Sequence, residues 1–229
     1  MSMKLLVALA AAALSVPAMA YESGTFILRT GIATVSPDVD SDALALSGTE
    51  LTGTAADVDD ASALGLTGVY MLNDHWGVEL VAATPFTHDL EVKGLGATFD
   101  LGETKHLPPT VLLQWYPMDA NSNIQPYVGL GLNYTVFFDE EIDSQANEVF
   151  AGLGATGNAD LSLDNSFGMA AEAGVDFAFG QDQRWLFNLS VWWMDIDTEA
   201  EVKVPGVGTI KADVELDPLV YMAGLGYRF

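Results

Sequence analysis

The sequence contains no cysteine and very few cationic residues. Without cysteine, a disulfide scaffold or a zinc–thiolate site is impossible. Only 8 of the 229 residues are Lys or Arg, against 32 Asp and Glu, and the formal net charge is −24. A nucleic-acid-binding face needs clustered cations, so nucleic acid is excluded as a partner.

The chain is not an acidic disordered protein either. Half of its residues are apolar and 10% are aromatic, whereas disordered acidic chains are poor in both classes. The mean hydropathy of +0.25 is high for a chain with this much negative charge. The composition therefore indicates a folded protein whose apolar and acidic surfaces face different surroundings.

A continuous apolar run stands at the N-terminus. Lys4 precedes the apolar residues 5–14, and Ala18-Met19-Ala20 forms a small-x-small cleavage motif. This pattern is typical of a secretory signal peptide, so we predict a signal peptide at residues 1–20 and an exported domain at residues 21–229. A buried N-terminal helix is the alternative, but the run is too short to span a bilayer and its flanking residues fit export.

After residue 20 there is no apolar stretch of 18 residues, and apolar residues alternate with small or polar ones. At the C-terminus, Leu219, Tyr221, Leu225 and Tyr227 share one parity. Successive side chains of a strand point to opposite faces, so this alternation predicts strands. The same test predicts eight strands, at residues 25–35, 63–72, 76–86, 107–116, 127–138, 169–179, 185–196 and 219–229.

The connectors between these strands differ in length. Short turns are predicted at residues 73–75, 117–123 and 180–183, and long or acidic loops at 36–60, 87–106, 139–160 and 198–208. Short turns on one rim and long loops on the other are typical of outer-membrane barrels. Such barrels close because lipid leaves no backbone polar group unpaired. We therefore predict an all-β fold: a closed eight-stranded antiparallel transmembrane β-barrel in the bacterial outer membrane.

A soluble eight-stranded barrel with apolar faces turned inward is the alternative fold. Its other faces would then be rich in charged residues, yet here they carry mainly Gly, Ala, Thr, Ser and Asn. Small residues suit the narrow lumen of an eight-stranded membrane barrel. Aromatic residues beside the short turns predict an interfacial girdle, formed by Trp76, Trp115, Tyr116, Tyr127, Trp185, Tyr227 and Phe229.

Several segments resemble the OmpW family of small outer-membrane barrels, including its OprG-like members. They are residues 76–86 (WGVELVAATPF), 106–110 (HLPPT), 126–134 (PYVGLGLNY), 190–198 (SVWWMDIDT) and 226–229 (GYRF). The loops at 36–60 and 139–160 depart from the family pattern. The resemblance implies an eight-stranded barrel with a role in passive uptake of small, largely hydrophobic solutes. Tyr227 and Phe229 also resemble the terminal signal that barrel-insertion machinery recognises.

Several polar residues fall on the inward parity of the predicted strands. Buried charges are tolerated only when they are paired and hydrogen-bonded. Arg29 and Arg228 therefore need carboxylate partners, which Glu79, Glu172 and Asp176 offer. A structural polar plug is one interpretation, and a path for protons or polar solutes is the other. The predicted lumen network is Arg29, Glu79, Gln114, Asn133, Glu172, Asp176, Asn188 and Arg228.

Apolar residues share the inward parity with this network, namely Val81, Leu112, Trp192 and Met194. Apolar side chains in a narrow lumen exclude water and form gates that work by dewetting. We predict a hydrophobic gate at these residues, with Val81 and Trp192 at the constriction. Simple packing inside a closed barrel is the alternative.

Three prolines fall at one level of the hairpin formed by the third and fourth strands. Its turn is predicted within residues 94–97, which places Pro85 roughly opposite Pro108 and Pro109. Proline cannot donate to a strand ladder, so pairing should stop there. We predict a lateral opening toward the lipid at Pro85, Pro108 and Pro109. A plain strand end or bulge is the alternative.

No motif predicts a catalytic site, a cofactor or a resident metal. His88, His106 and Asp89 share one hairpin and offer metal-ligand types, but such residues more often line a rim. We therefore expect no enzyme but a passive channel for small, largely hydrophobic or neutral solutes. These solutes would enter a loop-side vestibule and leave through the lumen or the lateral opening.

Two other functions remain open. One is a structural or receptor barrel whose loops bind lipopolysaccharide or extracellular ligands, and the other is a barrel hydrolase. The partners expected overall are outer-membrane lipid and lipopolysaccharide, small hydrophobic solutes, and the barrel-insertion machinery.

Overall fold

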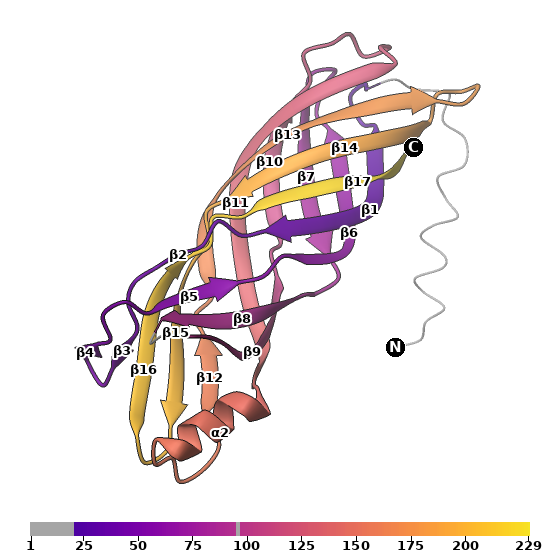
Figure 1. Ribbon diagram of the computed structural model, residues 1–229. Helices are drawn as coiled ribbons and strands as arrows, with labels where there is room; N and C mark the ends of the chain where they lie inside the picture. Colours follow the sequence, from indigo (N-terminus) through magenta and orange to yellow (C-terminus); the bar gives the residue numbers. More distant parts are fainter. Residues whose placement is uncertain (1–20, 95–96) are drawn as a thin grey trace, which may run out of the picture.

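The computed structural model describes residues 21–94 and 97–229, and the predicted signal peptide, residues 1–20, lies outside them. Antiparallel strands pair in the order β10-β7-β6-β1-β17-β14-β13-β11, and a pairing between β10 and β11 closes the cylinder (Figure 1). The predicted closed barrel of eight strands is therefore confirmed. Its strands are β1 (Phe26–Ser36), β6 (Ala61–Met71), β7 (Trp76–Ala83), β10 (Thr110–Trp115), β11 (Ile124–Ile142), β13 (Ser166–Phe179), β14 (Trp185–Met194) and β17 (Leu219–Arg228).

The alternation along the strands places apolar side chains on the outside of the barrel. On β11, Val128, Leu130 and Leu132 are 50%, 67% and 53% exposed. On β1, Leu28 and Ile32 are exposed, whereas Arg29 is fully buried. A closed sheet with an apolar exterior is the arrangement that lipid requires. The soluble alternative, with apolar faces turned inward, is wrong.

The aromatic girdle is only partly as predicted. Trp76, Trp115 and Trp185 are exposed on the outer face, but Tyr116 and Tyr127 are buried in the lumen. The reason is the strand period of two, because Trp115 points outward and its neighbour Tyr116 must then point inward.

The pairing between the third and fourth strands of the barrel is interrupted. The ladder of β7 and β10 runs from Trp76↔Trp115 to Val81↔Thr110. It resumes at Phe86↔His106, between β8 (Phe86–Gly94) and β9 (Ala97–Leu107). Residues 82–85 and 107–109 lie in the break. The predicted third and fourth strands, 76–86 and 107–116, are therefore each divided at the prolines, because proline supplies no N–H to the ladder.

The hairpin that contains the break was placed correctly. Gly94 pairs with Ala97 at its end, which agrees with the predicted turn at 94–97. Residues 95 and 96 themselves lie outside the described part of the chain.

The segments predicted as long loops instead build an extension beyond the rim that lies opposite the C-terminus (Figure 1). The predicted long loops contain strands and one helix, because these segments carry an alternation of their own. On β8, for example, His88 and Leu90 are buried while Thr87 and Asp89 are exposed. Besides β8 and β9, the extension contains β2 (Asp40–Ser41), β3 (Ala45–Leu46), β4 (Thr49–Glu50), β5 (Ala55–Val58), α2 (Ser144–Gly152), β12 (Asp160–Leu163), β15 (Asp197–Val204) and β16 (Gly208–Glu215).

Within residues 21–94 and 97–229, no helix is both long enough and apolar enough to cross a membrane.

Candidate functional site

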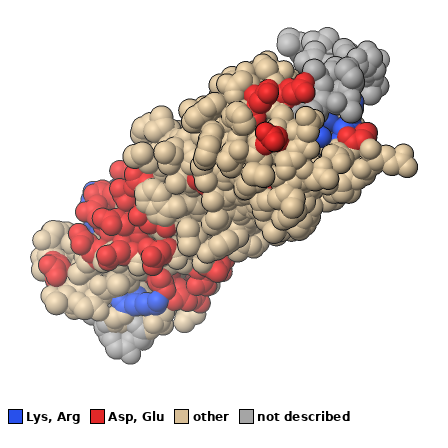
Figure 2. Space-filling view, turned by 90° about the horizontal axis from the view of Figure 1, so that it is seen from above, with Lys and Arg blue, Asp and Glu red and all other residues tan. Residues whose placement is uncertain are grey.

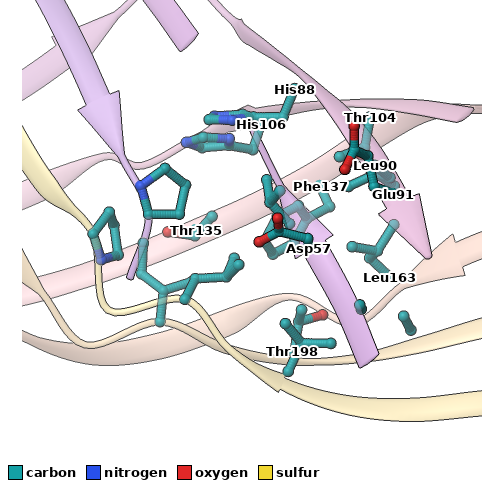
Figure 3. Close-up of a pocket in the computed structure, with 18 of the residues that line it drawn as sticks. Asp57, His88, Leu90, Glu91, Thr104, His106, Thr135, Phe137, Leu163 and Thr198 are labelled. Atoms are coloured by element: carbon teal, nitrogen blue, oxygen red, sulfur yellow. The ribbon is translucent and has the colours of Figure 1, made fainter. Parts of the chain in front are cut away.

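The extension and the adjoining rim of the barrel surround an apolar cavity, which we call the vestibule (Figure 3). Strands β5, β8 and β9 supply one part of its wall, and β1, β11, β12, β15 and β16 contribute to the rest. The lining surface is almost entirely apolar. Its main apolar contributors are Leu90, Leu101, Phe137, Leu163, Ile196 and Val214.

Three stacked rings, from Phe86, His88 and His106, lie at the β8–β9 side of the vestibule. The rings of His88 and His106 are nearly parallel, with centroids 4.9 Å apart, and Phe86 stacks on the other side of His106 at 5.3 Å. The two histidines are therefore brought together, as their positions in the hairpin predicted. Asp89 is exposed on the opposite face, so the trio that would offer metal-ligand types does not converge.

Both histidines are held in the neutral form. They lie beyond the apolar belt, since the outward residue Thr87 beside them is polar and exposed. Burial, and to a smaller extent the neighbouring His88, lowers the pKa of His106 to about 3. Burial likewise lowers the pKa of His88. The vestibule therefore carries no positive charge from these rings at neutral pH.

We expect the neutral His106 ring to make the extension sensitive to acid. An unfolded histidine takes up its proton near pH 6.5, whereas folded His106 does so only at about pH 3. Between these values the unfolded state binds more protons, so stability falls as the pH falls. The contribution is complete above pH 6.5 and is lost toward pH 3. An imidazole ¹⁵N titration measures this, and protonation of His106 near its ordinary pKa would contradict it.

The predicted gate residues come together where the vestibule meets the barrel. Leu112, Trp192 and Met194 are buried in one apolar cluster, and Val81 packs against it. The indole N–H of Trp192 is buried and has no hydrogen-bond partner in the described part of the chain. Apolar side chains packed in this way in a narrow lumen exclude water. Its action as a gate stays a prediction.

A smaller cavity lies between this cluster and the interrupted ladder. Its lining includes Val81, Phe86, Pro108 and Trp192. It adjoins the vestibule, because the Phe86 ring stacks on His106, which lines the larger cavity. Of the three prolines, Pro108 is buried, whereas Pro85 and Pro109 are exposed. Of the three, Pro108 therefore borders the internal cavity, and the lateral opening itself stays a prediction.

Arg29 is the centre of the polar network deeper in the lumen. Its guanidinium donates to both carboxylate oxygens of Asp176, at 3.0 and 2.6 Å, and to Glu79 at 3.1 Å. It also donates to the hydroxyl of Tyr116 at 3.0 Å, and its carbon lies 4.8 Å from the centre of the Tyr127 ring. Bidentate pairing with a carboxylate is among the strongest arrangements for arginine.

The network continues through Tyr116 and Asp176. Tyr116 donates to the side-chain oxygen of Gln114, which in turn donates to Glu172, both at 2.7 Å. Asn188 donates to Asp176 at 2.8 Å. The structure therefore joins most of the predicted network into one buried, hydrogen-bonded unit inside the barrel, consisting of Arg29, Glu79, Gln114, Glu172, Asp176 and Asn188.

The two remaining predicted residues lie apart from that unit. Asn133 donates to Thr110 at 2.8 Å and approaches the sulfur of Met194 at 3.7 Å, beside the constriction. Arg228 donates to the carbonyl of Gln183 at 2.8 Å. The carboxylate partner expected for Arg228 was wrong, since within the described residues it forms no ion pair.

Tyr21 accounts for the absence of an ion pair between Arg228 and Asp176 in the described residues. Its ring lies 5.2 Å from the Arg228 guanidinium carbon, and its hydroxyl donates to Asp176 at 2.6 Å. The tyrosine thus occupies the side of Asp176 that Arg228 would need. Membership of Tyr21 in the network was not predicted from the sequence. Tyr116 and Tyr127 were also missed, although their inward parity indicated that both lie in the lumen.

One group of carboxylates has a spacing that fits a metal. Oxygens of Asp195, Asp197 and Asp217 lie within 4.8 Å of one another where β14 meets β15. Asp195 already accepts the N–H of Met169 at 3.3 Å, and Asp217 accepts that of Ile196 at 3.4 Å. These carboxylates therefore satisfy backbone groups at strand ends, and we assign them no metal.

Known proteins share this architecture. Residues 22–229 match the OmpW family. The chain is 43% identical to outer membrane protein W of Vibrio cholerae, over 97% of this chain and 96% of the relative. It is 45% identical to outer membrane protein W of Escherichia coli, over 94% and 93%. The crystal structure of OprG from Pseudomonas aeruginosa matches with a TM-score of 0.83 at 48% identity, over 91% of this chain and 97% of OprG. The chain therefore belongs to the OmpW family, and it is a β-barrel of the bacterial outer membrane.

Proposed function

We propose that the barrel is a passive conduit for small, largely hydrophobic or neutral solutes. Solutes enter the vestibule from outside, pass the cluster around Trp192, and leave sideways into lipid at the prolines. The observation that supports this proposal is the contrast within the interior. An apolar cavity lies in the extension, whereas a hydrogen-bonded network around fully buried Arg29 lies in the lumen.

The lateral route is favoured because opening it costs less free energy than opening the lumen. A solute that passed through the lumen would separate Arg29 from Asp176 and Glu79, and breaking a buried ion pair costs about 3–5 kcal/mol. At the prolines the ladder between Val81↔Thr110 and Phe86↔His106 is already unpaired. A solute can therefore leave there without breaking strand hydrogen bonds.

The proposal is tested by uptake into vesicles with lipopolysaccharide in the outer leaflet. A plain phospholipid bilayer would not do, because an alkane dissolves through it without help. The folded protein should accelerate the entry of n-octane and leave chloride entry at background, with leucine as a neutral solute of intermediate polarity. Vesicles with heat-denatured protein are the control. If n-octane entered equally fast with and without folded protein, the proposal would fail.

We expect Trp192→Ala to raise n-octane uptake in the same vesicles. Trp192 is 2% exposed and is the largest side chain of the constriction, so its removal leaves space for a solute. The matched control is Trp193→Ala, since the Trp193 side chain is 39% exposed on the lipid-facing side. Unchanged uptake and unchanged bilayer conductance in a folded Trp192→Ala barrel would rule out the gate.

A receptor role is the second candidate, and the charge of the extension favours it. Figure 2 shows acidic side chains gathered on the extension, whereas the barrel wall in view carries few charges. Removing the exposed hairpin of β3 and β4 separates the candidates. A receptor would lose its extracellular ligand or lipopolysaccharide partner, while a conduit would still admit n-octane.

A further inference from the structure

Two buried polar atoms at the wall of the vestibule have no hydrogen-bond partner among the described residues. They are Nε2 of His88 and Oγ1 of Thr104, and these residues are only 3% and 2% exposed. A buried polar group without a partner lowers stability, so such groups are uncommon in folded proteins. Both residues line the vestibule, and Figure 3 shows them on its β8–β9 side.

The two residues face each other across the hairpin. His88 on β8 is the direct cross-strand partner of Thr104 on β9, and both side chains are on the buried face. Directly opposite residues of an antiparallel pair have Cβ atoms roughly 4.5–5.5 Å apart. The two unpartnered atoms therefore belong to adjacent side chains of the vestibule wall.

The hydrogen-bonding role of His88 follows from its other ring nitrogen. Nδ1 lies 2.5 Å from the carbonyl oxygen of Asp59. A carbonyl can only accept, so Nδ1 carries the proton and Nε2 is left as an acceptor. The Thr104 hydroxyl both donates and accepts. The group that satisfies both atoms must donate to His88 and can accept from Thr104, which is what a hydroxyl does.

The other threonines of the vestibule are already satisfied. Thr135 donates to the side chain of Asn133 at 2.7 Å, and Thr198 donates to the carbonyl of Asp164 at 2.8 Å. Among the threonines that line the vestibule, Thr104 is thus the one whose hydroxyl has no partner in the described part of the chain.

Charged ligands do not fit beside His88 and Thr104. The lining residues that the structure describes include Asp57 and Glu91 but neither Lys nor Arg, so a carboxylate would meet repulsion and no cation. An ammonium would lose its water inside an apolar cavity, which is costly. Resting on the function proposed above, we infer that the vestibule preferentially binds apolar molecules that carry one hydroxyl group, such as medium-chain primary alcohols.

The test compares 1-octanol, methyl octyl ether and n-octane on the full barrel in lipid nanodiscs. Occupancy is followed by NMR of ¹³C-methyl groups of Leu90 and Leu163, against the mole fraction of each compound in the lipid. We expect 1-octanol to bind about tenfold more tightly than n-octane, about 1.4 kcal/mol. The ether can only accept, so it should bind with intermediate strength.

Variants assign the preference to the two atoms. Thr104→Val and His88→Phe should each remove most of the tenfold preference, whereas Thr104→Ser should keep it. The matched control is Thr198→Val, which removes a satisfied hydroxyl from the same cavity and should leave the preference intact. Resistance of the folded barrel to heat on gels verifies that each variant is folded.

The inference is overturned if 1-octanol and n-octane bind the native vestibule equally, or if the preference survives both Thr104→Val and His88→Phe. It is also overturned if neither compound binds. The uptake of n-octane does not depend on the hydroxyl. If n-octane still passes while the alcohol preference is absent, only this inference fails, and if n-octane does not pass, the proposed conduit fails by itself.

Discussion

Replacing Arg29 by methionine is expected to destabilise the folded barrel by about 3–5 kcal/mol, because a buried ion pair loses one partner. Arg29 is fully buried and lies 2.6 Å from Asp176 and 3.1 Å from Glu79. Methionine fills similar space but leaves two carboxylates in the lumen without their cation. Equilibrium unfolding in detergent micelles, read as loss of the heat-resistant band on gels, measures the change.

Two further variants identify the cause of this loss. Lys211→Met removes a cation from surface pairs with Glu199 and Glu201, where the lysine side chain is 47% exposed, so stability should change far less than in Arg29→Met. Combining Arg29→Met with Asp176→Asn should recover part of the loss, because the uncompensated charge is removed. If Arg29→Met were as stable as Lys211→Met, the lumen network would not be the structural plug described above.

The double variant Pro108→Val with Pro109→Val is expected to reduce uptake of n-octane severalfold without opening the lumen. Valine supplies the N–H that proline lacks and favours extended backbone, so β9 and β10 can approach β7 and β8 more closely. The two ladders around the break differ by one residue in register, from Val81↔Thr110 to Phe86↔His106. Closure should therefore be partial, and some uptake should remain.

A proline elsewhere in the barrel provides the matched control. Pro126 lies within β11, where the ladder to β13 continues through the pair Pro126↔Val175. Pro126→Val should therefore leave n-octane uptake unchanged. Undiminished uptake in a correctly folded Pro108 and Pro109 double variant would count against lateral exit.

The barrel was predictable from sequence because its pattern has a period of two over long strands. That period assigned Arg29, Glu79 and Trp192 to the lumen and Leu130 to the lipid face, all of which the burial confirms. The break at the prolines was predictable because proline has no backbone N–H to donate to a strand ladder. These features depend on local chemistry, which a single chain displays directly.

The extension was not predictable in the same way, although part of the information was present. Alternation along residues 86–94 is visible in the sequence, but the acidic residues among them suggested solvated loops. The place of Tyr21 between Asp176 and Arg228 has no periodic pattern behind it, because it depends on how the end of the domain meets the rim. The stacked orientation of His88 and His106 likewise depends on packing against Phe86.

The most direct test of the transport route is to map where an apolar solute touches the protein during passage. An octyl diazirine, activated by light in vesicles with a lipopolysaccharide outer leaflet, labels the residues it meets, and mass spectrometry locates them. We predict labels in the vestibule at Leu90 and Phe137 and at the break near Ala83 and Pro108. Labels at Gln114 or Asn188, inside the polar lumen, would contradict lateral exit.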